Sequence, residues 1–244
     1  MTLRARAIII VVAVVLVMVA AALTYRKYTL MESTAVVVVP AQVGSDANSM
    51  PAISAPIAFG VGVTAATRLS VQAQASGIES QLAADSSNTQ LWMSLATTKQ
   101  IGGDYAGALE DLQYAAKLNF SDPTPHMALG DLYTNNLKQY DKAEQEYREA
   151  LAIQPAGSDP YRALFELYTT TSYKPNPTAP VDILKQGLTV NPKAVDLQIL
   201  LARYYRTEGD AADAKATFDA AIANATAQGQ TDLAAQIKTD AASK

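Results

Sequence analysis

Hydrophobic and small residues recur at helical spacing between Asn88 and Pro155, and the pattern repeats after about 34 residues. Small residues stand where two helices would cross closely, and large residues stand where a side chain would fill the space between helices. These positions are Leu95, Ala108, Leu112 and Ala115 in the first copy, and Leu129, Ala143, Tyr147 and Ala150 in the second. Because residues three or four apart share one face of a helix, each copy predicts a helical hairpin.

The same register continues past Pro155 through two further copies. The large residue of the first helix recurs at intervals of 34, 35 and 37 residues, through Leu95, Leu129, Leu164 and Leu201. The large residue of the second helix recurs at intervals of 35, 37 and 34, through Leu112, Tyr147, Leu184 and Phe218. The two series together place one extra residue in the turn of the second copy and the other extra residues in the turn of the third, around Ser172 to Ala179. Insertions in turns leave helices intact, so we expect four hairpins in register.

This pattern resembles the tetratricopeptide repeat (TPR), whose loose consensus has Trp, Leu-Gly, Tyr, Ala, Phe, Ala and Pro at fixed intervals. Trp92 stands at the Trp position, Leu129-Gly130 at the Leu-Gly position, and Pro155 closes the second copy. The resemblance implies an all-α, TPR-type α-solenoid of about four hairpins, at about 89–122, 123–157, 158–194 and 195–228. Helices from about Val63 to Asp85 and from Thr231 to Ala242 are expected to cap its ends, because an open hairpin shows its apolar face to water.

The resemblance also implies a concave groove, lined by the first helix of each hairpin, that binds proteins or peptides. The residues carried over to this face are Met93, Thr97, Gln100, Met127, Asp131, Thr134, Arg162, Glu166, Thr169, Ile199, Arg203 and Arg206. In family members that clamp a C-terminal carboxylate, Lys and Asn line the groove near the first repeats. Here Met93, Thr97 and Asp131 hold those positions, so that class of ligand is not expected.

The predicted groove is uncharged at its start, acidic in its middle and basic at its end. Asp131 and Glu166 supply the acidic part, and Arg203 and Arg206 supply the basic part. The two arginines are three residues apart and lie on one face of a helix. Their guanidinium groups are suited to hold an acidic segment of a partner. The alternative is that they pair with Glu166 or Asp196 within the array, or stay in water.

An uncharged apolar run from Ala7 to Leu23 precedes the repeats. With Thr24 it would span about 27 Å as a helix, close to the roughly 30 Å of a hydrocarbon core. We expect residues 1–27 to be a signal anchor, with residues 7–24 in the lipid bilayer. The alternative is a signal peptide cleaved near Ala22, where small residues precede the cut.

The segment that follows the apolar run indicates the topology of the chain. From Tyr28 to Thr67 there is no Lys or Arg, which suits a translocated segment. We therefore expect a single-pass protein of the cytoplasmic membrane, with its N-terminus in the cytoplasm and its repeats outside. Residues 28–62 are rich in Ala, Ser and Pro and are predicted to be a flexible linker before the repeat domain, residues 63–244.

Composition narrows the chemistry that this chain can perform. The net charge of -4 offers no basic surface, so we expect no nucleic-acid partner. The absence of cysteine excludes disulfides and thiol catalysis. His126, the one histidine, falls in the position of Trp92, and we expect it to pack rather than to bind a metal. There is no phosphate-binding glycine loop and no Gly-x-Ser-x-Gly motif. We expect no metal site, no cofactor and no enzymatic activity.

Together with the apolar N-terminal run, the TPR resemblance implies a membrane-anchored bacterial scaffold that binds other proteins on the extracytoplasmic side. One alternative is an ancillary chaperone or assembly factor for secreted or cofactor-carrying proteins, a frequent role of anchored bacterial TPR proteins. Another is a structural subunit of a surface assembly or filament, with the apolar N-terminus packed in its core. The apolar run lacks the Glu that type IV pilin-like subunits carry a few residues into theirs, which speaks against the filament.

Overall fold

The computed structural model describes residues 49–169, 173 and 175–243, which fall within one compact unit beginning at Asn48. The predicted membrane anchor, residues 7–24, lies outside the described residues. Within the described ranges, no helix is both long enough and apolar enough to cross a membrane.

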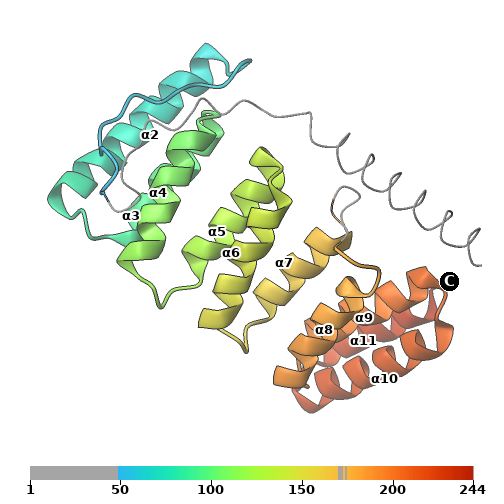
Figure 1. Ribbon diagram of the computed structural model, residues 1–244. Coiled ribbons are helices and arrows are strands. Elements are labelled where there is room, and N and C mark those ends of the chain that lie inside the picture. The colour runs from blue at the N-terminus through green and yellow to red at the C-terminus, as the bar shows by residue number, and fades with distance from the viewer. Residues whose placement is uncertain (1–48, 170–172, 174, 244) are drawn as a thin grey trace, which may run out of the picture. The chain divides into compact units, whose positions relative to one another are not determined.

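The described part of the chain is a succession of α-helices without a strand, and each helix packs against the next (Figure 1). The helices are α2 (Ala65–Ala84), α3 (Thr89–Ile101), α4 (Tyr105–Leu118), α5 (Thr124–Leu132), α6 (Tyr140–Ile153), α7 (Ser158–Thr169), α8 (Ala179–Val190), α9 (Val195–Glu208), α10 (Ala211–Ala227) and α11 (Thr231–Ala242), with a π-helical turn, η2 (Tyr133–Leu137), after α5. The pairs α3–α4, α5–α6, α7–α8 and α9–α10 are the four predicted hairpins. The helices α2 and α11 stand at the two ends, as expected of capping helices.

The turns inside the first and last hairpins share one construction. Gly103 and Gly209 have φ values of 78° and 84°, a left-handed conformation that glycine adopts at little cost. The next residue then caps the second helix. Asp104 accepts a hydrogen bond from the Gly107 amide, and Asp210 accepts one from the Asp213 amide. The sequence Gly-Asp therefore ends one helix and starts the next.

The extra residue of the second copy is accommodated by η2, where the helix widens to a π-helical turn. Lys138 follows with φ 55°, and the Gln139 amide donates to the Tyr133 carbonyl oxygen over 2.9 Å. The insertion thus stays between α5 and α6 and leaves both helices in register. The insertion of the third copy falls around residues 170–178, of which 170–172 and 174 lie outside the described residues.

The core follows the predicted positions. The large second-helix residues Leu112, Tyr147, Leu184 and Phe218 are all at most 3% exposed. Trp92 and the first-helix residues Leu95, Leu129, Leu164 and Leu201 are also buried. Trp92 meets the ring of Tyr114 on α4 edge to face, with centroids 5.0 Å apart. The hairpins are therefore held by the large and small residues that define the repeat pattern.

Residues 53–63, of which the sequence placed 53–62 in a flexible linker, pack as a strap on α2 and the first hairpin. The Gly60 amide donates to the Gly102 carbonyl oxygen over 2.8 Å, and the Ala58 amide donates to Asp104 Oδ2 over 3.1 Å. Ile53 and Ile57 contact the core around Trp92. The segment forms no helix, and its apolar residues beside Pro51 and Pro56 cover this part of the core.

Candidate interaction groove

All twelve predicted groove residues lie on the first helices of the hairpins or, for Thr134, on η2, and none is fully buried. The exposed ones are Thr97, Asp131, Arg162, Glu166, Thr169 and Arg203, and the half-buried ones are Met93, Gln100, Met127, Thr134, Ile199 and Arg206. Met93, Met127 and Ile199 are half-buried because each packs against a neighbouring core cluster. That the twelve form one binding surface stays a prediction.

The start of the predicted groove is hollow and uncharged. A cavity of about 640 Å³ opens between α2 and α3, and Thr97 lines it. The other lining residues are Ala73, Gln74, Gly77, Ile78, Gln81, Leu91, Ser94, Thr98 and Ile101. They offer amide and hydroxyl groups beside aliphatic carbon, and none of them carries a charge.

In the middle of the predicted groove, the charges of two carboxylates raise the pKa of one tyrosine, Tyr147. The Tyr147 hydroxyl donates to Asp131 Oδ1 over 2.7 Å and lies 3.4 Å from Thr134 Oγ1. Burial raises the pKa of Tyr147 above its ordinary value, and the charges of Asp131 and Glu166 raise it further. Burial also raises the pKa of Asp131, which the hydrogen bond from Tyr147 partly offsets. Tyr147 therefore stays a neutral donor, and the sequence had assigned it to packing alone.

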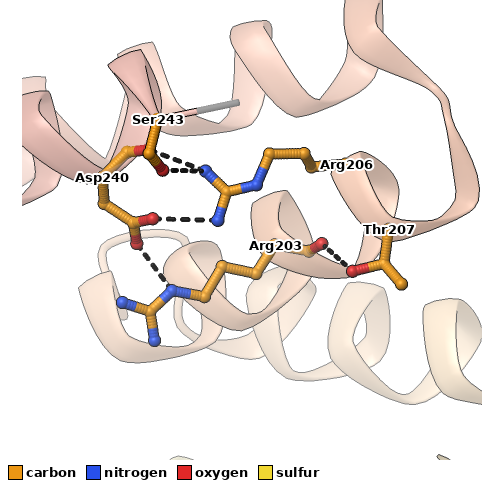
Figure 2. Close-up of polar contacts among 5 residues, drawn as sticks. All are labelled: Arg203, Arg206, Thr207, Asp240 and Ser243. Carbon is orange, nitrogen blue, oxygen red and sulfur yellow. Dashed lines mark hydrogen bonds and ion pairs between the residues drawn. The ribbon is translucent and has the colours of Figure 1, made fainter.

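At the end of the predicted groove, Arg203 and Arg206 converge on one carboxylate of the chain itself (Figure 2). Arg203 Nε lies 2.6 Å from Asp240 Oδ2, and Arg206 Nη2 lies 2.9 Å from Asp240 Oδ1. Arg206 Nη1 also donates to the Asp240 carbonyl oxygen and to Ser243 Oγ. Its guanidinium lies over the ring of Phe218, 5.3 Å from the centroid.

The partner of these arginines differs from both partners that the sequence suggested. Asp196 instead accepts a hydrogen bond from Ser158 Oγ, and the carboxylate comes from α11. Partial burial alone would raise the pKa of Asp240, but hydrogen bonds from Arg206 and Arg203 outweigh it and hold the pKa below its ordinary value. The arginines therefore hold α11 in place. The sequence shows only that the two arginines lie on one face of α9, and this role becomes visible once the position of α11 is known.

His126 forms a polar contact that the sequence did not indicate. Its Nδ1 lies 2.8 Å from Glu146 Oε2 on α6, and the side chain is half-buried. The hydrogen bond with Glu146 raises the pKa of His126, although burial opposes that shift. Within the described residues, no group of three or more His, Cys, Asp or Glu side chains is placed to hold a metal ion.

A cluster around Glu144 on α6 was also missed by the sequence analysis. Glu144 accepts hydrogen bonds from Tyr168 (2.7 Å), Tyr173 (2.6 Å) and Arg148 (2.8 Å). Burial alone would raise the pKa of Glu144, but these donors together lower it. The cluster borders a cavity of about 180 Å³ between the second and third hairpins. The cluster links these two hairpins, because Glu144 lies on α6 and Tyr168 lies on α7.

The first hairpin contains a buried ion pair. Lys99 Nζ on α3 lies 2.7 Å from Asp111 Oδ2 on α4, and the two residues are 2% and 0% exposed. Asp111 Oδ1 accepts no hydrogen bond from any described residue. Burial raises the pKa of Asp111 to about 7, although Lys99 works against that shift. Neither residue stood out in the sequence, because both look like surface charges of an amphipathic helix.

Comparison with protein families bears on the second hairpin directly. Residues 124–156 match the tetratricopeptide repeat model, and this range spans α5, η2 and α6. The match supports the tetratricopeptide repeat family. The described residues form a TPR-like helical array around that hairpin, and a TPR-like fold is in general suited to binding other proteins.

Solved structures with similar folds have low sequence identity to this chain. A crystal structure of MamA is 16% identical, with 67% of this chain and 91% of that chain covered and a TM-score of 0.49. The PilF protein of Pseudomonas aeruginosa is 18% identical, with 72% and 84% covered and a TM-score of 0.49. YrrB, described as a TPR protein with an unusual peptide-binding site, is 15% identical, with 67% and 90% covered and a TM-score of 0.44. The comparison with curated proteins finds no match.

Proposed function

We propose that this chain is a scaffold that binds other proteins through the first-helix face of its TPR-like array. The observation that carries this proposal is the tetratricopeptide repeat at 124–156, set among hairpins whose first helices leave all twelve predicted residues at least partly accessible. Repeat arrays of this kind stack helix pairs into extended binding surfaces. The role is one of binding, without an enzymatic activity and without a nucleic-acid partner.

The contacts of the arginines redefine which part of the face is free for a partner. Arg203 and Arg206 already hold Asp240, so an acidic partner segment would have to displace α11 to reach them. The uncharged cavity at Thr97 and the exposed side chains of α5 and α7 carry no such internal helix. We therefore place the partner on α3, α5 and α7, with an uncharged portion over α3.

The proposal also includes the membrane anchor, residues 7–24, with the repeats on the extracytoplasmic side. Support for it comes from the apolar run and from the absence of Lys and Arg between Tyr28 and Thr67. Full-length protein should resist extraction from membranes by high pH, and protease added to spheroplasts should remove the repeats. A soluble form beginning near Ala22 would replace the anchor by a cleaved signal, and full protection from protease would reverse the topology.

Site-specific photo-crosslinking in cells tests the binding face. A photoreactive phenylalanine analogue is placed at Thr97 on α3 or at Arg162 on α7. Matched control positions are Gln113 on α4 and Glu149 on α6, which are also exposed but lie on second helices. We expect the first-helix positions to crosslink to one common protein and the control positions not to do so. Crosslinks to that protein from the second helices alone would overturn the proposal.

A further inference from the structure

The described array begins with half a hairpin. The residues that end α2, α4, α6 and α8 are Asp85, Asn119, Gln154 and Asn191, and each donates its amide hydrogen to the carbonyl oxygen four residues earlier. Their intervals of 34, 35 and 37 residues equal those of the first-helix leucines. The helix α2 therefore stands in the register of a second helix. Among the described residues, no first helix precedes it.

The face of α2 that would contact a first helix is open. In α4 the residues that contact the first helix are Ala108, Leu112 and Ala115, all at most 1% exposed. Their counterparts 34 residues earlier are Gln74, Ile78 and Gln81, and all three line the cavity of about 640 Å³. Gln74 and Gln81 are exposed and Ile78 is half-buried. The cavity between α2 and α3 is thus the place that a first helix would fill.

The space around Gly77, which also lines the cavity, shows how much room an incoming helix would have. A Cβ atom added at Gly77 would meet nothing within 4 Å. At Gly130, in a complete hairpin, an added Cβ would overlap the ring of Tyr147. The open face of α2 therefore has room for a bulky side chain from an incoming helix.

The array ends with the other half of a hairpin. The helix α11 buries Ala234 and Ile237 against α9 and α10, as Gln198 and Leu201 are buried on α9. In this alignment Lys238 and Ala241 of α11 correspond to Ala202 and Tyr205, which pack against residues of α10. Both Lys238 and Ala241 are exposed. The helix α11 is a first helix whose second-helix side is uncovered.

The two half hairpins are also oriented to complete each other. The start of α2 lies beside the turn inside the first hairpin, because Gly60 bonds to Gly102. The end of α11 lies beside the turn inside the last hairpin, because Arg206 bonds to the carbonyl oxygen of Asp240 (Figure 2). Within a hairpin, a first helix ends and a second helix begins at this same turn.

We propose that α11 of one copy of this chain enters the α2–α3 cavity of a second copy and completes a hairpin there. The interface would continue the packing by which each hairpin already follows the previous one. In the alignment above, Lys238 takes the position of Ala202 and Gly130, and Ile78 takes the position of Leu112 and Tyr147. Lys238 would therefore meet Ile78, where its aliphatic stem can cover the apolar side chain while its ammonium group reaches water. The cavity lining carries no charge that would repel it.

This contact joins two different surfaces, so it is heterologous. Every assembly keeps one open α2–α3 cavity at one end and one uncovered α11 at the other. Copies therefore add head to tail, and the association does not close at a dimer unless the rotation between copies forms a ring. The contact uses the α2–α3 cavity, which Thr97 lines, so within an assembly that part of the face over α3 stays open to another partner only on the end copy. The binding face of α5 and α7 lies outside this contact and stays open on every copy.

Sedimentation velocity of the full-length chain in detergent, over a roughly hundredfold range of concentration, tests this contact. Gly77→Trp fills the cavity of α2, and Ala241→Trp blocks the open side of α11. Gln113→Trp, at an exposed position of α4, is the matched control. Circular dichroism establishes that each variant folds like the parent.

We expect the parent and Gln113→Trp to form species larger than a dimer as concentration rises. Gly77→Trp alone and Ala241→Trp alone should stay monomeric, or need at least a tenfold higher concentration to associate. Mixed together, the two variants should form a 1:1 dimer and nothing larger, because the two ends that remain are both blocked by tryptophan. A monomeric parent, association blocked by only one of the two substitutions, or association that persists in the double variant would each overturn the proposal.

Discussion

The ring of Tyr147 on α6 lies directly against the backbone of Gly130 on α5, so that any Cβ at Gly130 would overlap it. The sequence pattern predicted that a small residue on one helix packs against a large residue on the other, and this contact is such a pair. It joins two residues 17 positions apart and fixes the distance between the two helices. It also brings the Tyr147 hydroxyl to Asp131 on the predicted binding face.

Gly130→Ala should therefore destabilise the array by about 1–3 kcal/mol, the usual cost of overpacking a tight contact. Urea denaturation followed by circular dichroism measures the change. Gly77→Ala is the matched control, because that glycine is also helical but has open space around its Cβ. The control should be neutral or gain up to about 1 kcal/mol, since alanine favours a helix over glycine. Equal effects of the two substitutions would show that the Gly130 contact is wrong.

Ala143→Leu should also cost about 1–3 kcal/mol, because Ala143 is fully buried where α6 meets the rest of the core. Ala152→Leu adds the same side chain to an exposed position of the same helix and should change stability by at most about 0.5 kcal/mol. Thermal melts of the two variants beside the parent give the comparison. An Ala143→Leu protein that melts like the parent would contradict the register of the second hairpin.

Replacing one member of the Lys99–Asp111 pair should lower the free energy of unfolding much more than replacing both members. Lys99→Met or Asp111→Leu alone leaves a buried group without its partner, and each should cost about 3–5 kcal/mol. The double variant Lys99→Met/Asp111→Leu should lie much closer to the parent, because two apolar side chains can fill the same space. Urea midpoints of all four proteins complete the cycle, and additive losses would refute the coupling.

The same proteins give a dependence on pH. The pKa of Asp111, ordinarily 3.8, is raised to about 7 in the folded chain, so the folded state binds this proton more tightly than the unfolded state. The protonated form of Asp111 therefore stabilises the folded state. This contribution to the free energy of unfolding is present in full below about pH 4 and is lost as pH rises through about 7. Relative to the double variant, the parent should therefore lose stability between these limits. A flat difference would place the pKa of Asp111 at its ordinary value.

Asp240→Asn should loosen α11 without unfolding the hairpins. The pKa of Asp240 is lowered in the folded chain, so the contact stabilises α11 at neutral pH and is lost as pH falls through that lowered pKa. Hydrogen exchange should quicken several-fold in residues 231–242 and stay unchanged in α5 and α6. Asp219→Asn, which breaks the exposed Lys215–Asp219 pair on α10, should leave exchange unchanged. Unaltered exchange of α11 in the Asp240→Asn protein would show that the arginines do not fasten it.

The repeat pattern in the sequence predicted most of the helices and their packing. Leu112, Tyr147, Leu184 and Phe218 are buried as the spacing predicted, because close packing of two helices demands a fixed alternation of sizes. The end of the array was also readable, since Leu233, Ala234 and Ile237 mark a helix with one apolar side. The single extra residue of the second copy was located in its turn, although η2 itself could not be foreseen.

Contacts that depend on the rotation of one helix against another were not readable. His126 and Glu146 are 20 residues apart, and Arg206 and Asp240 are 34 apart, with no periodic signal to pair them. Lys99 and Asp111 resemble ordinary surface charges until both helices are in place. The strap of residues 53–63 was missed for a different reason, because a segment without regular structure gives no spacing from which to infer its docking surface.

The central claim is that the first-helix face of this array binds a protein partner. The most direct measurement is the affinity between the purified full-length chain and the protein that crosslinks at Thr97 and Arg162, by isothermal titration calorimetry. A variant with Thr97→Trp and Arg162→Glu, both at exposed positions, is compared with a matched variant carrying Gln113→Trp and Glu149→Arg. We expect the first variant to weaken binding at least tenfold, which is about 1.4 kcal/mol, and the second to bind like the parent. Unchanged binding by the first variant, with loss of binding by the second, would contradict the account.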